Sequence, residues 1–394
     1  MDALGRIARR FPLVPRARPA CRPLDERIRE IADLARAAAE PTTTDPLATA
    51  ASAQNKAALI ASDCGMPDLA RDLCQRHSAL YLQARPLTAR TARHALEPLV
   101  NLARLDIRAG APNAARNNLE GLFRAVRDSD TVVIDGQEVP LADVTGSHDE
   151  RHDLNQWLWS VVLADGIRAL TGAGRWDDAV AHAERLRGVG RRLLDGRQAA
   201  IIAHVLAGEP ETASRMLEQS TITEPWEQAV AACLSMFCHR SIGSTATSAK
   251  ATKIEEYLAL DAKPELVTFR TRVALTAIDL SGDAAYHGED QMVHRVVDEA
   301  LDLGDGYAAR EILRHPRSGK QLTETQAKLL SAVTTSAGLG SGHVPAQLLE
   351  VLIGAVEKSQ HVTASALATL PVDNLTECPS PRVFGSSKLT TDSA

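Results

Sequence analysis

Two histidines one helical turn apart form the pair whose spacing best suits metal chemistry in this sequence. His148 and His152 lie in a run that also holds Ser147 and Glu150, a spacing typical of a capping box at the start of a helix. Both imidazoles then share one helix face, where a neighbouring aspartate could complete a ligand set. The glutamate of the HExxH pattern is not in its place, however. We therefore interpret the run as an acid-rich first helical turn, keep a polar ligand-binding role as the alternative, and expect no metal and no cofactor.

The helix that begins here carries two tryptophans and one carboxylate among apolar positions. An exposed Trp157 or Trp159 would anchor a partner or a ligand, whereas buried indoles would fill the joint between adjacent helix pairs. Asp165 continues the apolar stripe, which predicts a buried carboxylate. Because such a group needs partners, we expect a structural ion pair with Arg168 or Arg175 rather than a general base.

An arginine group follows between residues 185 and 197, with Gly188 and Gly190 inside it. On a concave surface, Arg187, Arg191 and Arg192 would suit a phosphate or the carboxylate of a peptide. The Gly-x-Gly fragment is not a dinucleotide fingerprint, because no strand precedes it and the third glycine is missing. A solvated helix face is the alternative interpretation of this group.

Other motifs point to no reaction. The glycine-rich run at residues 338–343 has neither a preceding strand nor a following lysine, so we expect a flexible connector rather than a phosphate loop. Cys233 and Cys238 lie on different sides of one expected helix and are interpreted as buried thiols. We find no Ser/His/Asp pattern, P-loop or nucleophile elbow in the sequence.

The elements that must position these residues are helices punctuated by one recurring phrase. A glycine is followed five residues later by alanine and then, after three more residues, by an apolar residue; the glycine and alanine pairs are Gly65/Ala70, Gly110/Ala115, Gly174/Ala179, Gly208/Ala213 and Gly304/Ala309. Glycine suits the left-handed end of one helix, and a small alanine lets the next helix approach closely. Helix pairs of this kind bury their faces by stacking on one another.

This phrase resembles the small-residue signature of tetratricopeptide repeats, over about residues 46–320. The step from Gly174 to Gly208 equals the 34-residue period of that family, whereas the other steps are irregular and most consensus aromatics are missing. The resemblance implies an all-α fold, an α-solenoid of irregular antiparallel helix pairs, and a concave surface that binds a peptide or a protein.

The helical pattern is broken near residues 131–141, where Asp135-Gly136 between two short apolar runs predicts an inserted β-hairpin with a type I′ turn. We expect five parts along the chain, which are a flexible arm (1–23), an N-terminal helical-repeat block (24–240), a linker (241–252), a C-terminal helical block (253–370) and a disordered tail (371–394).

Composition narrows the class of function. The formal net charge of -6 disfavours direct nucleic-acid binding, and no apolar run is long enough to span a membrane. Arginine far exceeds lysine, which is typical of a GC-rich bacterium, and six unpatterned cysteines fit a cytoplasmic location. We expect an interaction module for a peptide or protein partner, with a regulatory or scaffolding role. An enzyme or biosynthetic accessory protein with a polar site near the hairpin and the helix of residues 148–165 is the alternative, and self-assembly into a homo-oligomer stays open.

Overall fold

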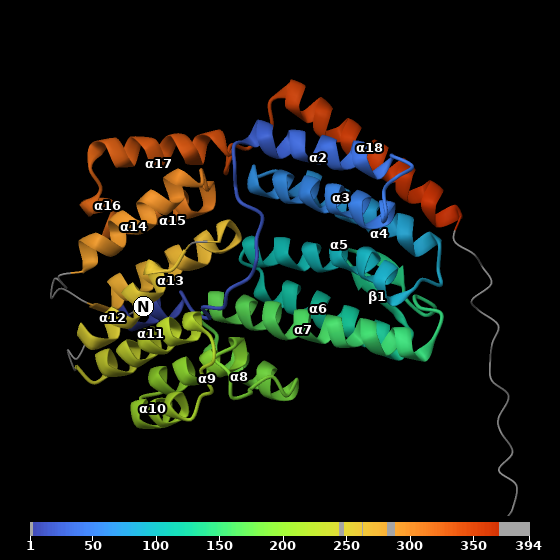
Figure 1. The fold of residues 1–394 in the computed structure, drawn as a ribbon. Coiled ribbons are helices and arrows are strands. Elements are labelled where there is room, and N and C mark those ends of the chain that lie inside the picture. The colour runs from blue at the N-terminus through green and yellow to red at the C-terminus, as the bar shows by residue number, and fades with distance from the viewer. Residues whose placement is uncertain (1–2, 244–247, 262, 282–287, 370–394) are drawn as a thin grey trace, which may run out of the picture.

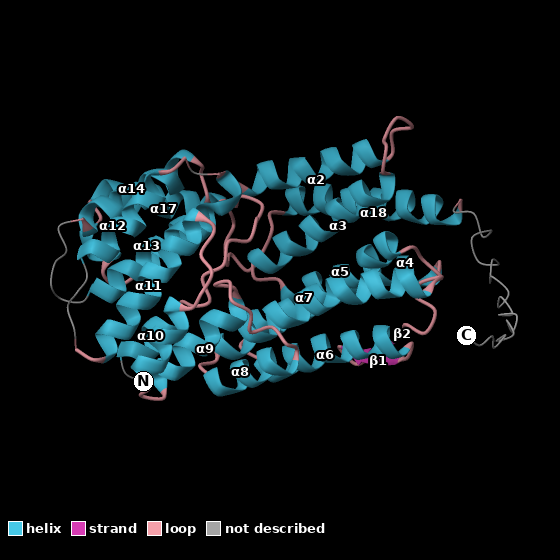
Figure 2. Cartoon of the chain, turned by 60° about the horizontal axis from the view of Figure 1, so that its bottom comes forward, coloured by secondary structure: helices cyan, strands magenta, loops and turns pink. Residues whose placement is uncertain are grey.

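The computed structural model describes residues 3–243, 248–261, 263–281 and 288–369. Its helices in chain order are α1 (Ala3–Ala8), α2 (Leu24–Ala38), α3 (Pro46–Asp63), α4 (Pro67–Gln83), α5 (Ala89–Arg108), α6 (Pro112–Asp128), α7 (His148–Gly172), α8 (Trp176–Arg185), α9 (Asp195–Leu206), α10 (Pro210–Glu218), α11 (Pro225–Ser241), α12 (Ser248–Ala259), α13 (Val267–Ser281), α14 (Glu289–Asp302), α15 (Gly306–Arg314), α16 (Ser318–Gln321), α17 (Glu324–Ser336) and α18 (Ala346–Ala368). A short 3-10 turn, η1 (Pro264–Leu266), precedes α13, and the strands β1 (Thr131–Ile134) and β2 (Gln137–Pro140) follow α6. The predicted all-α class with one hairpin is confirmed (Figure 2).

The recurring glycine–alanine phrase has the role that the sequence predicted. All five glycines have positive φ angles, from 57° to 81°, in the turns that end α3, α5, α7, α9 and α14. All five alanines are completely buried at the start of the following helix. Each phrase therefore joins two antiparallel helices at close distance. The glycine in a left-handed conformation ends the first helix, and the small alanine side chain lets the second helix pack closely against it.

The hairpin between α6 and α7 is the predicted two-stranded element. Asp135 and Gly136 both have positive φ, at 51° and 75°, as a type I′ turn requires. The register pairs Ile134 with Gln137 and Thr131 with Pro140. Ile134 and Val139 are buried, so this face of the hairpin packs inward and the other faces solvent.

The helices form two layers. Successive contacts join α3, α5, α7, α9, α11, α13 and α15, which we call the inner helices, while α4, α6, α8, α10 and α14 cover them on the outside. This alternation is the stacked arrangement of helix pairs that a solenoid requires. Within the described residues, no helix is both long enough and apolar enough to cross a bilayer.

Two large hydrophobic cores hold most of the buried apolar residues of the described chain, and they divide it at a place that the sequence did not predict. The first block contains α2–α6, the hairpin, the first half of α7 and α18; the second contains the rest of α7 and α8–α17. Helix α7 serves both, through Leu158 in the first core and Leu170 in the second. Helix α18, expected in a C-terminal block, instead packs on α2 and α3 (Figure 1). Its buried face, which carries Leu352, Val356 and Leu367, needs a partner helix, and α2 and α3 supply it.

The expected linker is also partly helical. Residues 248–252 begin α12, so this helix starts before the expected linker ends. Residues 244–247 and the expected disordered tail at 371–394 lie outside the described residues.

The first 23 residues differ most from the expected flexible arm. Ala3–Ala8 form α1, and residues 9–23, which we call the N-terminal segment, run extended between the two blocks (Figure 1). Phe11 and Leu13 are 2% and 1% exposed, because they fill gaps in the second core. Prolines prevent a helix here but do not prevent an extended chain from packing.

Candidate functional site

The predicted site residues at the start of α7 are separated from the predicted buried carboxylate. His148 is 91% exposed and His152 is also exposed, whereas Asp165 lies seventeen residues further on, about 25 Å along the helix axis. The enzyme alternative requires these groups to converge, and they do not. In the described part of the chain, no three His, Cys, Asp or Glu side chains are placed to hold a metal ion.

The two tryptophans contact neighbouring elements. Trp159 is 36% exposed, and its indole N–H donates to the carbonyl of Leu186 at 3.0 Å, in the turn after α8. Trp157 is half-buried, with the Arg93 guanidinium 6.0 Å from its ring centre. Both indoles therefore help to fix the joint between α7 and its neighbours.

The arginine group at the end of α8 and in the following loop makes contacts in different directions. Arg192 donates to Glu227 of α11 at 2.9 Å, and Arg185 bonds to α6. Arg187 and Arg191 are exposed. The group does not surround one point, so its predicted role as a joint anion site has no geometric support.

Asp165 is the centre of a polar site that the sequence partly predicted. Arg104 of α5 donates to one carboxylate oxygen at 2.8 Å, and Arg168 of α7 donates to the other at 2.7 Å. Burial acts to raise the pKa of Asp165, but the two guanidinium charges outweigh it and lower the pKa. The predicted ion pair with Arg168 is confirmed, while Arg175 pairs with Asp178 instead.

A row of polar side chains extends from this centre along the inner face of α5. Glu97, Asn101, Arg104 and Arg108 follow one another at steps of four, three and four residues, so they share one helix face. Asn101 accepts from Arg104 at 3.0 Å and donates at 3.3 Å to Asn55 of α3. This spacing was a readable signal that the sequence interpretation missed.

Asp63, at the end of α3, is a second centre. Three guanidiniums lie near its carboxylate, with Arg27 at 2.6 Å, Arg108 at 3.3 Å and Arg18 at 3.9 Å. The hydroxyl of Tyr307 also donates to it. One carboxylate therefore joins α2, α3, α5, α15 and the N-terminal segment.

Five arginines of these two centres keep part of their surface in solvent. We call them the arginine cluster, and each side chain is between 36% and 41% exposed: Arg16, Arg18, Arg104, Arg108 and Arg168. Arg16 pairs with Asp195 of α9, and its charge also helps to lower the pKa of Asp165. The cluster lies where the two blocks meet.

The inner helices of the second block hold the N-terminal segment as they would hold a bound peptide. The Gln198 side-chain oxygen accepts from the backbone N–H of Leu13 at 2.7 Å, and its amide group donates to the Leu13 carbonyl at 2.8 Å. Phe11 packs against Phe237, with ring centres 6.0 Å apart. Both the backbone and the side chains of an extended segment are thus recognised.

Acidic side chains complete this recognition. Arg16 bonds to both oxygens of Asp195, at 2.8 and 2.7 Å, and Arg10 bonds to Asp279 at 2.5 Å. Asp305 accepts from the backbone N–H of Cys21 at 2.9 Å. Charged groups on α9, α13 and α15 therefore match the basic character of the segment.

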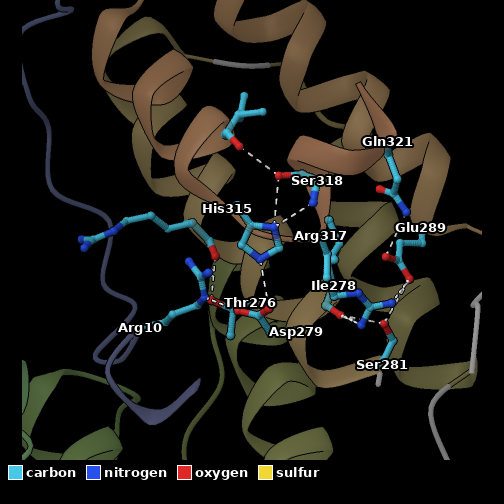
Figure 3. A network of polar contacts seen from close by, with 12 residues as sticks. Arg10, Thr276, Ile278, Asp279, Ser281, Glu289, His315, Arg317, Ser318 and Gln321 are labelled. Carbon is cyan, nitrogen blue, oxygen red and sulfur yellow. Dashed lines mark hydrogen bonds and ion pairs between the residues drawn. The ribbon is translucent and has the colours of Figure 1, made fainter. Parts of the chain in front are cut away.

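One arrangement near α16 has the contacts of a Ser–His–Asp triad, since the Ser318 hydroxyl lies 3.0 Å from Nδ1 of His315, but its serine is buried (Figure 3). Nε2 of His315 bonds to Asp279 at 3.0 Å, while Nδ1 accepts from the backbone N–H of Ser318 at 3.0 Å. The Ser318 hydroxyl donates to the Ile312 carbonyl at 3.0 Å and is completely buried. No substrate can reach it, so the network is a structural clasp between α13 and α16.

The hairpin forms one wall of a cleft of about 240 Å³. Its other walls are α4 and α5, and the hydroxyl of Ser78 on α4 has no hydrogen-bond partner there among the described residues. None of the lining residues comes from α7, so the cleft and the predicted polar residues of α7 are separate features.

Comparison with known proteins adds no relative. No family model, no curated protein and no solved structure matches the chain. The repeat character of the fold and the arrangement of the inner surface therefore rest on the geometry described above.

Proposed function

We propose that this protein is a helical-repeat interaction module that binds an extended segment of a protein partner on its inner helices. The observation that carries the proposal is the pair of hydrogen bonds between Gln198 and the Leu13 backbone. A buried side-chain amide that hydrogen-bonds to a backbone N–H and carbonyl can bind any extended peptide, because these bonds do not depend on the side chains of the peptide.

The first block offers similar groups that the N-terminal segment does not contact in this way. Asn55 and Asn101 lie on α3 and α5, beside the arginine cluster. Inner helices that already bind one segment within the chain are suited to bind a second one from outside it. We further propose a divergent tetratricopeptide-type protein of a bacterial cytoplasm, on the glycine–alanine phrase, the arginine-rich composition and the unpaired cysteines.

Site-specific crosslinking tests the proposal. A photoreactive amino acid is placed at Asn101 on the inner face of α5 and, as a matched control, at the exposed Arg124 on outer helix α6 of the same block. In lysate of the cells that make the protein, we expect a polypeptide adduct from position 101 and none from position 124. Adducts of equal yield from both positions, or none from position 101 in a folded protein, would refute the module.

A further inference from the structure

We propose that the arginine cluster selects an acidic segment of the partner, whose Asp and Glu side chains pair with Arg104, Arg108, Arg168 and their neighbours. This inference rests on the proposed function and specifies the chemistry of the partner at the same surface. The observation behind it is a local excess of guanidinium groups in a protein whose formal net charge is -6.

The excess arises because single carboxylates serve several arginines. Asp63 lies near three guanidiniums, and Asp165 pairs with two. A guanidinium carries five N–H donors, and Arg168 uses one nitrogen on Asp165. Each side chain of the cluster also keeps 36–41% of its surface exposed, and carboxylates are the planar acceptors that fit guanidinium groups.

The second block provides a precedent for this pairing within the same molecule. There the charges are reversed, since the inner helices supply Asp195 and Asp279 while the N-terminal segment supplies Arg16 and Arg10. One guanidinium nitrogen of Arg16 bonds to both oxygens of Asp195, a charge-assisted contact of the kind that makes Arg–carboxylate pairs strong. By the same chemistry, a surface that supplies arginines pairs with a segment that supplies carboxylates.

Two features favour an acidic peptide over other anions. The amides of Asn55 and Asn101 stand beside Arg104 and suit a peptide backbone, as Gln198 does for Leu13. The overall negative charge of the protein opposes the approach of a long polyanion such as a nucleic acid, whereas a short acidic segment carries little repulsion beyond its own contacts.

Fluorescence anisotropy with a labelled hexaglutamate peptide tests the proposal on the full-length protein, with hexaglutamine as the uncharged comparison. The variant Arg108→Gln/Arg168→Gln removes two members of the cluster. The matched control Arg29→Gln/Arg36→Gln removes two arginines that are each 66% exposed on α2. We expect Kd for hexaglutamate to rise at least about tenfold in the first variant and to stay unchanged in the control.

Two further measurements separate charge from folding. Thermal unfolding followed by circular dichroism establishes that each variant is folded at the assay temperature. The variant Arg108→Lys/Arg168→Lys keeps the charges but loses the forked donors, so we expect a smaller loss of affinity than with glutamine. Raising the salt concentration should weaken hexaglutamate binding in the wild type.

The outcomes that would overturn the proposal are distinct. Equal binding of hexaglutamine would show that carboxylates are not selected, and an equal loss in the α2 control would show that only net charge matters. Tripolyphosphate that binds while hexaglutamate does not would assign the cluster to a phosphate ligand. If position 101 crosslinks to a partner and Arg108→Gln/Arg168→Gln does not weaken the binding of that partner, this inference is wrong but the proposed interaction module is supported. If position 101 yields no adduct, the proposed module itself is wrong.

Discussion

The inner helices of the two blocks differ in what covers them. In the second block, α9, α11, α13 and α15 are covered by the N-terminal segment, which contributes Phe11 to the core and Arg10 and Arg16 to ion pairs. In the first block, the polar row on α5 and the Asp165 centre keep guanidinium groups in solvent. One surface is therefore already matched to a segment, and the other keeps partly exposed arginines.

This difference indicates how a repeat fold can combine stability and recognition. A covered inner surface adds apolar burial and satisfied hydrogen bonds, so it holds the blocks together. An uncovered one retains partly exposed polar groups, which in the proposed function pair with a segment of a second chain. The junction between them, at Asp63, is where the two roles meet.

The largest effect is expected from breaking that junction. The substitution Asp63→Ala leaves the buried Arg27 without its carboxylate, and the side chains of Asp63 and Arg27 are only 3% and 8% exposed. We expect the free energy of unfolding to fall by about 3–5 kcal/mol, measured by urea denaturation. Asp33→Ala, in an exposed pair on α2, is the matched control and should change it by less than about 0.5 kcal/mol. Similar losses for the two would show that Asp63 is no special junction.

A smaller effect is expected from uncovering the second block. Gln198→Ala removes the groups that bond to the Leu13 backbone and leaves its buried N–H unpaired. We expect a loss of about 1–3 kcal/mol and faster proteolysis within residues 9–22. The exposed Gln219→Ala should do neither. Unchanged proteolysis in Gln198→Ala would mean that the segment is held by its side chains alone.

Acid should destabilise the first block before the second. Burial lowers the pKa of His77 on α4 to about 3, below its ordinary value near 6.5. Since the unfolded state then binds the extra proton, stability is lost as pH falls below about 6.5, by up to about 1.4 kcal/mol per pH unit.

Glu227 in the second block behaves differently. Burial acts to raise its pKa, but bonds from Arg192 and Thr223 lower it to about 2, so its contribution is lost only below about pH 4.5. Urea denaturation between about pH 7 and pH 5 should show a slope that His77→Leu reduces and that Glu227→Gln leaves in place. A slope that His77→Leu does not change would refute the assignment.

The smallest effect is expected at the start of α7. His148→Ala and His152→Ala alter exposed side chains, so the free energy of unfolding should change by less than about 0.5 kcal/mol. Hexaglutamate binding should also be unchanged, because the arginine cluster lies near the other end of the helix. A clear loss of binding in either variant would move the recognition surface to the hairpin end.

The features that the sequence predicted correctly are those set by local chemistry. Asp135-Gly136 specified the hairpin turn, and each Gly-x4-Ala phrase specified a helix end and a close approach. These depend on the conformational range of one residue and on the size of another, which a short stretch of sequence contains.

The features that it did not predict depend on distant partners. The main surprise at Asp165 is Arg104, which lies 61 residues away, and the packing of Phe11 depends on helices that follow much later in the chain. Prolines and arginines in the N-terminal segment predicted a flexible arm. Burial of such residues is favourable only where a distant part of the chain supplies a matching surface. The sequence of helix α18 likewise does not indicate that it packs against α2 and α3.

The bond between Leu13 and Gln198 also sets an order of events during synthesis. The two residues are 185 positions apart, so a ribosome needs roughly 10 to 40 s to deliver the amide after the segment has emerged. The backbone N–H of Cys21 can bond to Asp305 only after about another hundred residues have been synthesised. The second block can therefore gain its full stability only after residue 305 has been synthesised, when the N-terminal segment can bond to all of its partners.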